Sequence, residues 1–335
     1  MVGEKLVALA VLDGLIALTV LCVAFIVELL FGDPSPNYPS KLRFRLHPTV
    51  WMGQLSLRLK KKLKNKSSKI EKFNGIVLAI VVILAFSLPV FLLLHVTYSF
   101  LGVAVYVIAG ALILKCTMCI KLESDWAIAA AQALEQNKLE EARQYSHFSR
   151  RESKGLTGPQ ISSAVIESMA ENLTDFKISP ILAYAVLGVS GAVAFRAINT
   201  LDGMVGFKDE ENINIGWFSA QLDTLVNFVP ARLAAALIVL ASFLLGGDYK
   251  NAWRIAKRDN AKTPSRNHGW PMAAMAGALR VELEKPGQYI LGDSIEELTP
   301  KKILDALRIR NMAILLAVLL SLPIIFFVRV FFFPF

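Results

Sequence analysis

The chain has 335 residues, of which 55% are hydrophobic and 19% charged, and its mean hydropathy is +0.51. Typical soluble chains are about 45–50% apolar even when glycine is counted, so this composition excludes disorder and argues against an ordinary soluble domain. The formal net charge of +9 would suggest nucleic acid in a soluble protein. In so apolar a chain it favours loop cations beside anionic lipid, and we expect a lipid partner and no nucleic acid.

Uninterrupted apolar stretches indicate where the chain crosses a membrane, because a helix needs roughly 20 such residues to span the hydrocarbon core. Three stretches are clear: Val7 to Phe31, Gly75 to Leu114 and Asn311 to Val328. The second is long enough for two spans, and we expect its turn near His95 to Ser99. The last span ends in an aromatic tail that suits the membrane interface.

Two further apolar stretches are weaker candidates. Ile178 to Phe195 is interrupted by proline and glycine residues, and Leu233 to Gly247 is short unless it includes Val226 to Arg232. The sequence therefore predicts an all-α, polytopic integral membrane protein with about five to six membrane-embedded helices, joined by helical cytoplasmic segments.

Polar segments separate these stretches. The segment from Pro34 to Lys72 is strongly basic, which places it on the cytoplasmic side. Residues 115–177 are predicted to form soluble helix, and residues 248–310 a second basic, mostly helical segment. We interpret the chain as a single membrane-embedded domain, divided into residues 1–114, 115–177, 178–247, 248–310 and 311–335.

The orientation of the middle of the chain is ambiguous. If residues 178–195 and 233–247 both cross the membrane, residues 196–232 lie on the opposite side from the polar segments that flank them. Either the first stretch is re-entrant, or the site is a cavity at membrane depth lined by broken helices. The second arrangement is the one we favour.

The densest chemical signal is a helical run in which Glu167, Glu171 and Asp175 follow one another at i, i+4 and i+8. Like charges at this spacing destabilise a helix, and a divalent cation would relieve the repulsion. A solvated polar face explains the pattern equally well from these residues alone.

Two further clusters favour a functional interpretation. Asn199 and Asp202 end one apolar run, and Asp223 and Asn227 precede another. Acidic and amide groups so close to hydrocarbon are costly to bury and by default mark a function. Hard oxygen ligands suit Mg²⁺, which is commonly held by one or two carboxylates together with substrate phosphates, so a phosphate-bearing ligand is expected.

Basic residues are available to hold such a phosphate. Arg232 is the best candidate, because its guanidinium allows bidentate contact, although a role as an arginine that reaches to the membrane interface fits equally well. Arg151 is a second candidate. The histidines His47, His95, His147 and His268 are too scattered in the sequence for a metal site. No phosphate-binding nucleotide fingerprint is present, so any ATP would be bound in another way.

Several short motifs, in order from about Glu28 to Gly292, together resemble the CobD/CbiB family of cobalamin biosynthesis, the membrane-associated adenosylcobinamide-phosphate (cobinamide) synthases. They are Gly32-Asp-Pro34, His47-Pro48, Trp51-Met-Gly53, Ile166-Glu-Ser-Met-Ala-Glu-Asn-Leu-Thr-Asp175, Ala197-Ile-Asn-Thr-Leu-Asp202, Gly216-Trp217, Leu222-Asp223, Asn227-Phe-Val-Pro-Ala-Arg232 and Asn267-His-Gly-Trp-Pro-Met-Ala-Ala-Met-Ala-Gly277.

The chain departs from the family pattern at five positions. Glu28 stands where aspartate is expected, Gly203 where serine is usual, Gln221 for an arginine, Thr224 for a second aspartate and Arg266 for a proline. The replacements at Gln221 and Thr224 weaken any catalytic role for those two positions.

The resemblance implies amide bond formation, in which a propionate carboxylate of adenosylcobyric acid is joined to (R)-1-aminopropan-2-ol or its O-phosphate with ATP and Mg²⁺. The residues themselves fit this reaction, and we expect Glu167, Glu171, Asp175 and Asp202 to hold the metal and, with Asp223, to form the catalytic group. The implied substrate-binding residues are Asn172, Asn199, Asn227, Arg232, Arg151, His47 and Asn267. The protein would be a multi-pass cell-membrane enzyme with an active site reached from the cytoplasm, and a homo-oligomer or an association with other membrane-bound corrinoid enzymes would fit.

Two other functions stay open. One is an intramembrane Mg²⁺-dependent transferase acting on a phospho-substrate. Asp202-Gly203 matches the start of the CDP-alcohol transferase pattern, but the Ala-Arg that should follow is absent. The other is a non-catalytic membrane sensor similar to the AmpE-like proteins, in which changes at Glu171 and Asp202 would leave function intact.

Overall fold

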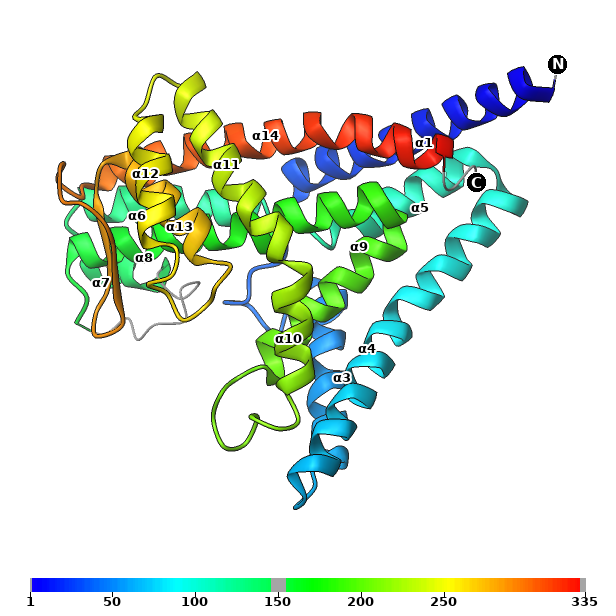
Figure 1. Ribbon diagram of the computed structural model, residues 1–335, viewed down its shortest axis with the longest axis horizontal. Coiled ribbons are helices and arrows are strands. Elements are labelled where there is room, and N and C mark those ends of the chain that lie inside the picture. The colour runs from blue at the N-terminus through cyan, green and yellow to red at the C-terminus, as the bar shows by residue number, and fades with distance from the viewer. Residues whose placement is uncertain (1, 146–154, 332–335) are drawn as a thin grey trace. The chain divides into compact units, whose positions relative to one another are not determined.

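The computed structural model describes residues 2–145 and 155–331, and in these residues it is helical apart from one short hairpin (Figure 1). The all-α prediction is confirmed. By contact the chain divides into two compact units. The first consists of Met1–Lys121, Ser179–Val226 and Leu320–Phe335, and the second of Leu122–Ile178 and Asn227–Leu319.

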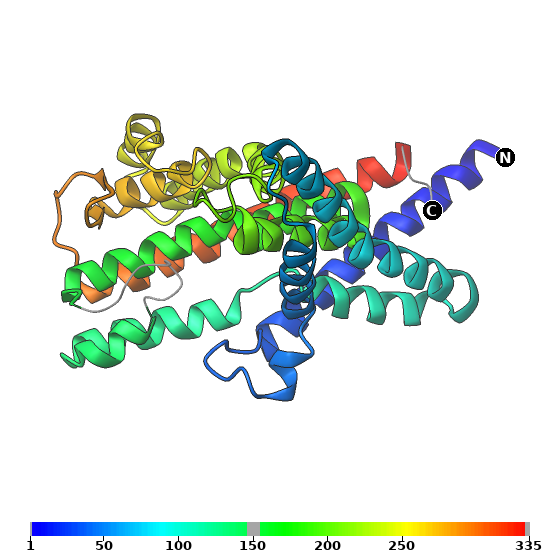
Figure 2. The ribbon, with the colours of Figure 1, turned by 90° about the horizontal axis from the view of Figure 1, so that it is seen from below.

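The first unit is built from long apolar helices. Its elements are α1 (Val2–Phe31), α2 (Leu42–Arg45), α3 (Pro48–Leu63), α4 (Ser68–Val96), the π-helix η1 (Thr97–Leu101), α5 (Val103–Lys115), α9 (Ser179–Val205) and α10 (Trp217–Val226). Helices α1 and α5 lie side by side (Figure 2). The turn expected near His95 to Ser99 is confirmed, since η1 ends at Leu101 and is followed by Gly102, whose φ of 87° suits a residue without a side chain.

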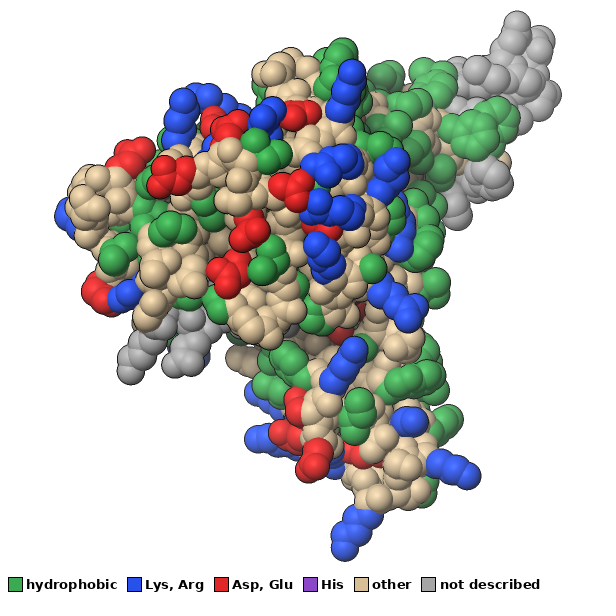
Figure 3. All heavy atoms as spheres, turned by 60° about the vertical axis from the view of Figure 1, so that its left-hand side comes forward, with side chains coloured by type: hydrophobic (Ala, Val, Ile, Leu, Met, Phe, Trp, Pro, Cys, Tyr) green, Lys and Arg blue, Asp and Glu red, His purple; other side chains and the backbone are tan. Residues whose placement is uncertain are grey.

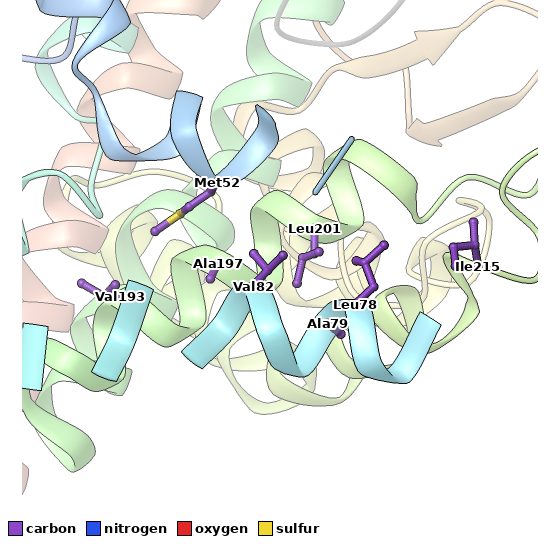
Figure 4. Packing of buried hydrophobic residues seen from close by; sticks show 8 residues of the cluster. All are labelled: Met52, Leu78, Ala79, Val82, Val193, Ala197, Leu201 and Ile215. Carbon is purple, nitrogen blue, oxygen red and sulfur yellow. The ribbon is translucent and has the colours of Figure 1, made fainter. Parts of the chain in front are cut away.

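A compact apolar core joins α3, α4 and α9 in this unit. Leu78, Ala79 and Val82 of α4 face Ala197 and Leu201 of α9 (Figure 4). Each of these side chains is fully buried, so their apolar surface contributes to the stability of the unit. Asn199 and Asp202 lie on the same turns of α9 as Ala197 and Leu201, which pack in this core.

Gly75 of α4 makes a very close backbone contact in this core. A Cβ at Gly75 would lie 2.3 Å from the backbone oxygen of Ile215, far inside van der Waals contact. We therefore expect Gly75→Ala to destabilise the protein by about 1–3 kcal/mol, as overpacking of a filled core does. Thermal unfolding of the detergent-solubilised variant would measure the loss. Gly110→Ala is the matched control, because the nearest side-chain atom there is 3.4 Å away; an equal loss in both variants would contradict this view.

The second unit contains shorter, more polar elements. They are α6 (Lys121–Glu135), α7 (Leu139–Arg143), α8 (Gly158–Leu173), the π-helix η3 (Thr174–Ile178), α11 (Phe228–Leu244), α12 (Tyr249–Asp259), α13 (Gly269–Leu279), the strands β1 (Glu282–Lys285) and β2 (Tyr289–Gly292), and most of α14 (Pro300–Phe331). Helix α13 packs on α8, α11 and α12. On the side of the hairpin and α7, acidic and basic side chains lie interspersed (Figure 3).

The hairpin was not expected from the sequence, which predicts mostly helix over residues 248–310. Its strands pair antiparallel with Glu282 opposite Gly292. Gly287 turns the chain at φ 71°, a conformation that favours glycine. Each strand is only four residues long, too short for a clear alternating pattern.

Four helical segments are long and apolar enough to cross a membrane: Val11–Phe31, Ser68–Leu101, Gly158–Val205 and Pro300–Val328. The number becomes five if the bent pair of α10 and α11 counts as one span, and α5 is a shorter apolar helix. The interruption expected in the stretch from Ile178 to Phe195 is real, because Gly188 breaks α9 with φ 71° and ψ −164°.

Candidate functional site

Two of the predicted acids lie where α8 ends. Thr157 starts this helix with a capping box that it forms with Gln160, and nearly every side chain from Ile161 to Leu173 is buried. Glu171 lies in the last turn of α8, and Asp175 lies in η3, which follows without a break. Single π-helical turns of this kind are rare and often occur at functional sites.

His268 lies between these two carboxylates. Its Nδ1 is 3.0 Å from Oε1 of Glu171, and its Nε2 is 3.3 Å from Oδ2 of Asp175. One ligand atom from each of the three residues can be chosen so that all lie within 4.8 Å of one another. Glu171 keeps 35% of its side chain exposed and Asp175 10%, so the group is open to solvent on one side. We call Glu171, Asp175 and His268 the acid–imidazole group.

The loop before α13 positions the imidazole. A Cβ at Gly269 would lie 2.0 Å from the backbone oxygen of Asn260, so only glycine allows this close approach. Burial alone lowers the pKa of His268, but the charges of Glu171 and Asp175 and their hydrogen bonds raise it well above the ordinary value. The imidazolium therefore offsets the repulsion of the two carboxylates.

The histidines are scattered in the sequence, as expected, but the fold brings His268 into a group that could hold a metal ion. This residue is 93 positions from Asp175 in the chain, and only the packing of α13 on α8 brings the two together. Its position directly after Asn267, inside a motif used for the resemblance, was the signal that could have identified it.

Glu167 points elsewhere. One carboxylate oxygen accepts a hydrogen bond from Ser163 Oγ at 2.6 Å, and the other accepts one from Tyr289 Oη at 2.7 Å. Ser163 also accepts a hydrogen bond from the backbone N–H of Glu284. Glu167 thus ties α8 to the hairpin, and it is outside the acid–imidazole group.

Arg232 and Asn267 meet in the same unit as the acid–imidazole group. Nη1 of Arg232 donates hydrogen bonds to Asn267 Oδ1 at 2.7 Å and to the backbone oxygen of Phe228 at 2.8 Å. The guanidinium carbon is 3.6 Å from the centroid of the Phe228 ring and 5.6 Å from that of Trp270. Among the described residues no carboxylate pairs with Arg232, so its charge is available to an anionic ligand.

Asn172 lies in a separate buried network. Its Nδ2 donates a hydrogen bond to Oε1 of Glu123 at 2.9 Å, and Oε2 of Glu123 binds both Lys177 and Arg310. Lys177 and Arg310 are fully buried. Removal of Glu123 would leave buried charge uncompensated, which is strongly destabilising. The amide of Asn172 therefore stabilises the unit.

The first unit holds four of the remaining candidates, of which Asn199, Asp202 and Asp223 lie on α9 and α10. Arg196 donates a hydrogen bond to Asn199 Oδ1 at 2.8 Å, and Asn199 donates a longer one, 3.4 Å, to Asp223 Oδ1, which links α9 to α10. Asp202 lies one turn beyond Asn199, and its Oδ1 would be 2.1 Å from a Cβ at Gly206. The buried Asn227 belongs to the second unit, and Arg151 lies outside the described residues.

His47 takes part in a charged network of the first unit. Its Nε2 is 3.4 Å from Asp33 Oδ1, and its Nδ1 is 2.7 Å from Thr49 Oγ1. Lys115 Nζ is 2.5 Å from Asp33 Oδ1 and 3.1 Å from Glu28 Oε2. The network joins the loop after α1 to the start of α3 and the end of α5.

This network predicts a pH dependence of stability. Burial lowers the pKa of His47, but hydrogen bonds and charge from Asp33 and Cys116 raise it to about 9. A folded-state pKa above the unfolded value near 6.5 stabilises the protein fully below pH 6.5, and this stabilisation is lost as the pH rises to about 9. It amounts to about 3 kcal/mol. Thermal unfolding measured from pH 6 to 9.5 should show this decline in stability. The stability of His47→Gln should depend less on pH over the same range. Parallel stability curves for the two proteins would contradict the stabilising role of His47.

The described residues form a helical protein with several apolar helices long enough to span a membrane. This protein also carries the acid–imidazole group. The family model for the CobD/Cbib protein matches residues 21–316. The chain belongs to this family.

The relatives agree with this assignment. The chain is 38% identical over 298 residues to the "Probable cobalamin biosynthesis protein CobD" of Methanothermobacter thermautotrophicus, covering 89% of this chain and 94% of that protein. The "Cobalamin biosynthesis protein CobD" of Dehalococcoides mccartyi is 35% identical over 315 residues, 93% of this chain and 99% of that protein. The protein of the same name from Klebsiella pneumoniae subsp. pneumoniae is 33% identical over 319 residues, 90% and 96%. No solved structure gives a match.

Proposed function

We propose that this protein acts in cobalamin biosynthesis as an ATP-dependent amide-forming ligase. It would join a propionate carboxylate of adenosylcobyric acid to (R)-1-aminopropan-2-ol or its O-phosphate, giving adenosylcobinamide or its phosphate. Membership of the CobD/Cbib family supports the pathway. The specific reaction is the one that the motif resemblance implies.

One observation carries the proposed chemistry. The second unit combines the acid–imidazole group with Arg232, whose charge no carboxylate of the described residues neutralises. Asn267, the hydrogen-bond partner of Arg232, is the residue directly before His268. A phosphate-bearing substrate requires carboxylates that hold a divalent cation and a guanidinium that is not neutralised by an acid, and the described residues of this unit offer both.

The donor set fits a divalent cation. Glu171 and Asp175 supply the carboxylate oxygens that Mg²⁺ prefers. A bound cation would replace the ring proton of His268, and the neutral imidazole would then be a nitrogen ligand that also admits Mn²⁺. We propose Mg²⁺, held by Glu171 and Asp175 of the second unit. When bound, the metal would neutralise phosphate charge and polarise the transferring group.

The protein residues would hold the reactants for two steps. In the first, a carboxylate oxygen of the corrinoid attacks the γ-phosphorus of ATP and ADP leaves, because a free carboxylate is a poor electrophile. In the second, the amine nitrogen attacks the acyl carbon, inorganic phosphate leaves and the amine loses a proton. Arg232 would bind the phosphoryl oxygens, and Asn267 would keep the guanidinium in place.

The reaction has a direct test. The purified protein is incubated with adenosylcobyric acid, ATP, Mg²⁺ and each form of the aminopropanol, and the products are identified by mass spectrometry. We expect an amide product and ADP with at least one amine, both dependent on Mg²⁺. If folded protein yields no amide with either amine, the proposed ligase activity is wrong.

The proposed location is the cell membrane, with the site reached from the cytoplasm. The basic segment from Pro34 to Lys72 supports this orientation. A cysteine placed at Asn65 should react with a membrane-impermeant reagent only when vesicles expose their cytoplasmic face.

A further inference from the structure

The first unit contains a cavity that the proposed reaction does not use. Its volume is about 580 Å³, and it is bounded by α1, the end of α4, η1, the start of α5 and the break in α9. The walls are mainly apolar. The lining residues that bear on its ligand are Asp13, Phe91, His95, Tyr98, Tyr106 and Gly188.

The cavity lies at one end of two membrane-spanning helices. Asp13 is near the start of the span Val11–Phe31, and Tyr98 is near the end of the span Ser68–Leu101. Helix α1 runs toward the basic segment and α4 runs away from it, so the start of one meets the end of the other. A hydrogen bond of 3.1 Å from Tyr98 Oη to Asp13 Oδ1 connects them. This end is opposite to the basic segment.

The break in α9 also faces this cavity. Gly188 interrupts the helix and is one of the lining residues. Backbone groups freed at membrane depth are tolerated only where protein covers them or where they line a cavity. Broken helices of this kind form the ligand sites of many membrane proteins.

Among the side chains that the structure describes, no lysine or arginine faces Asp13 in this cavity. Among the lining residues it is the only carboxylate, none is lysine or arginine, and the other titratable groups are His95 and the phenols of Tyr98 and Tyr106. The hydrogen bond from Tyr98 is neutral and engages one carboxylate oxygen. A carboxylate near hydrocarbon is costly without a cation, so the cavity has the electrostatics of a cation site.

Aromatic rings surround this position. Tyr98 and Tyr106 pack edge to face with centroids 5.3 Å apart, and Phe91 and His95 stack at 6.3 Å. Aromatic faces together with a carboxylate favour an organic ammonium over a small metal ion. The apolar walls favour a ligand that also carries an aliphatic chain.

We propose that this cavity binds the ammonium head group of a phosphoethanolamine lipid. The ammonium pairs with Asp13 among the aromatic rings, the lipid phosphate stays at the bilayer–water boundary, and an acyl chain lies along the apolar walls. This site is independent of the amide-forming reaction.

Native mass spectrometry of the full-length protein in detergent tests the proposal. The protein is titrated with short-chain phosphatidylethanolamine or with phosphatidylglycerol of the same chain length. We expect one phosphatidylethanolamine to bind at least tenfold more tightly than phosphatidylglycerol, and Asp13→Asn to lose this preference. Glu210→Gln removes one negative charge from an exposed position and should keep it.

Further measurements separate this site from nonspecific lipid binding and from misfolding. Thermal unfolding should show that Asp13→Asn stays folded, because asparagine is nearly isosteric and still accepts the hydrogen bond from Tyr98. Dodecyltrimethylammonium should compete with phosphatidylethanolamine, whereas free ethanolamine should not. Equal binding of both lipids, an unchanged preference in folded Asp13→Asn, or full competition by free ethanolamine would each overturn the proposal.

Discussion

Asp175→Asn should lower the rate of amide formation by about 100- to 1,000-fold, the range typical for loss of one electrostatic group at a reacting centre. Asp175 is the less exposed carboxylate of the acid–imidazole group and lies 3.3 Å from His268. Asparagine keeps the shape of the side chain but removes the charge that binds a divalent cation. Product formation measured by mass spectrometry and Mn²⁺ binding measured by calorimetry should both decrease.

Two comparisons make this prediction sharper. Glu297→Gln, at an exposed position of the same unit, should retain full activity and metal binding. Glu167→Gln should reduce stability more than metal affinity, because Glu167 is bonded to Ser163 and Tyr289. If Asp175→Asn binds Mn²⁺ as tightly as the unchanged protein, the acid–imidazole group is not the metal site.

Arg232→Gln should raise the KM for ATP or for the phosphorylated amine by about 10- to 100-fold, because loss of a charge-assisted hydrogen bond to a phosphate costs about 1.5–3 kcal/mol. Arg232→Lys should recover only part of this loss. A lysine keeps the charge, but it cannot make bidentate contact or stack on the rings of Phe228 and Trp270 as the guanidinium does.

The KM values identify which substrate Arg232 contacts. If only the KM for ATP rises, Arg232 contacts the nucleotide. If only the KM for aminopropanol phosphate rises, Arg232 contacts the amine substrate. Arg308→Gln, which removes an exposed arginine of the same unit, should leave both unchanged. Unchanged KM values in folded Arg232→Gln would show that Arg232 is a structural residue of α11.

The helical class and most spans could be predicted because they depend on local properties. Continuous apolar runs such as Asn311 to Val328 bury well only as helices in a membrane, where every backbone group must be bonded within its own segment. The hairpin around Gly287 could not be predicted, because its short strands are stabilised by contacts with α8 and not by their own pattern.

The acids of the candidate site were visible in the sequence, but their grouping was not. Glu167, Glu171 and Asp175 share a helical spacing, which says nothing about the partner each side chain finds. In the structure Glu167 pairs with Tyr289 and Asn172 with Glu123, whereas Glu171 and Asp175 share His268. Each of these partners is more than 45 positions away in the chain from the residue that it contacts.

The sequence by itself determined that this is a helical membrane protein of the CobD/Cbib family, because hydropathy and the order of the motifs are properties of the amino-acid sequence alone. Only the tertiary structure decided that His268 completes the acid–imidazole group, that Arg232 has no acidic partner among the described residues, and that Asp13 lines a cavity at the break in α9. The physical reason is that charge compensation acts between side chains that are near in space, and helix packing sets those distances without regard to separation in the chain.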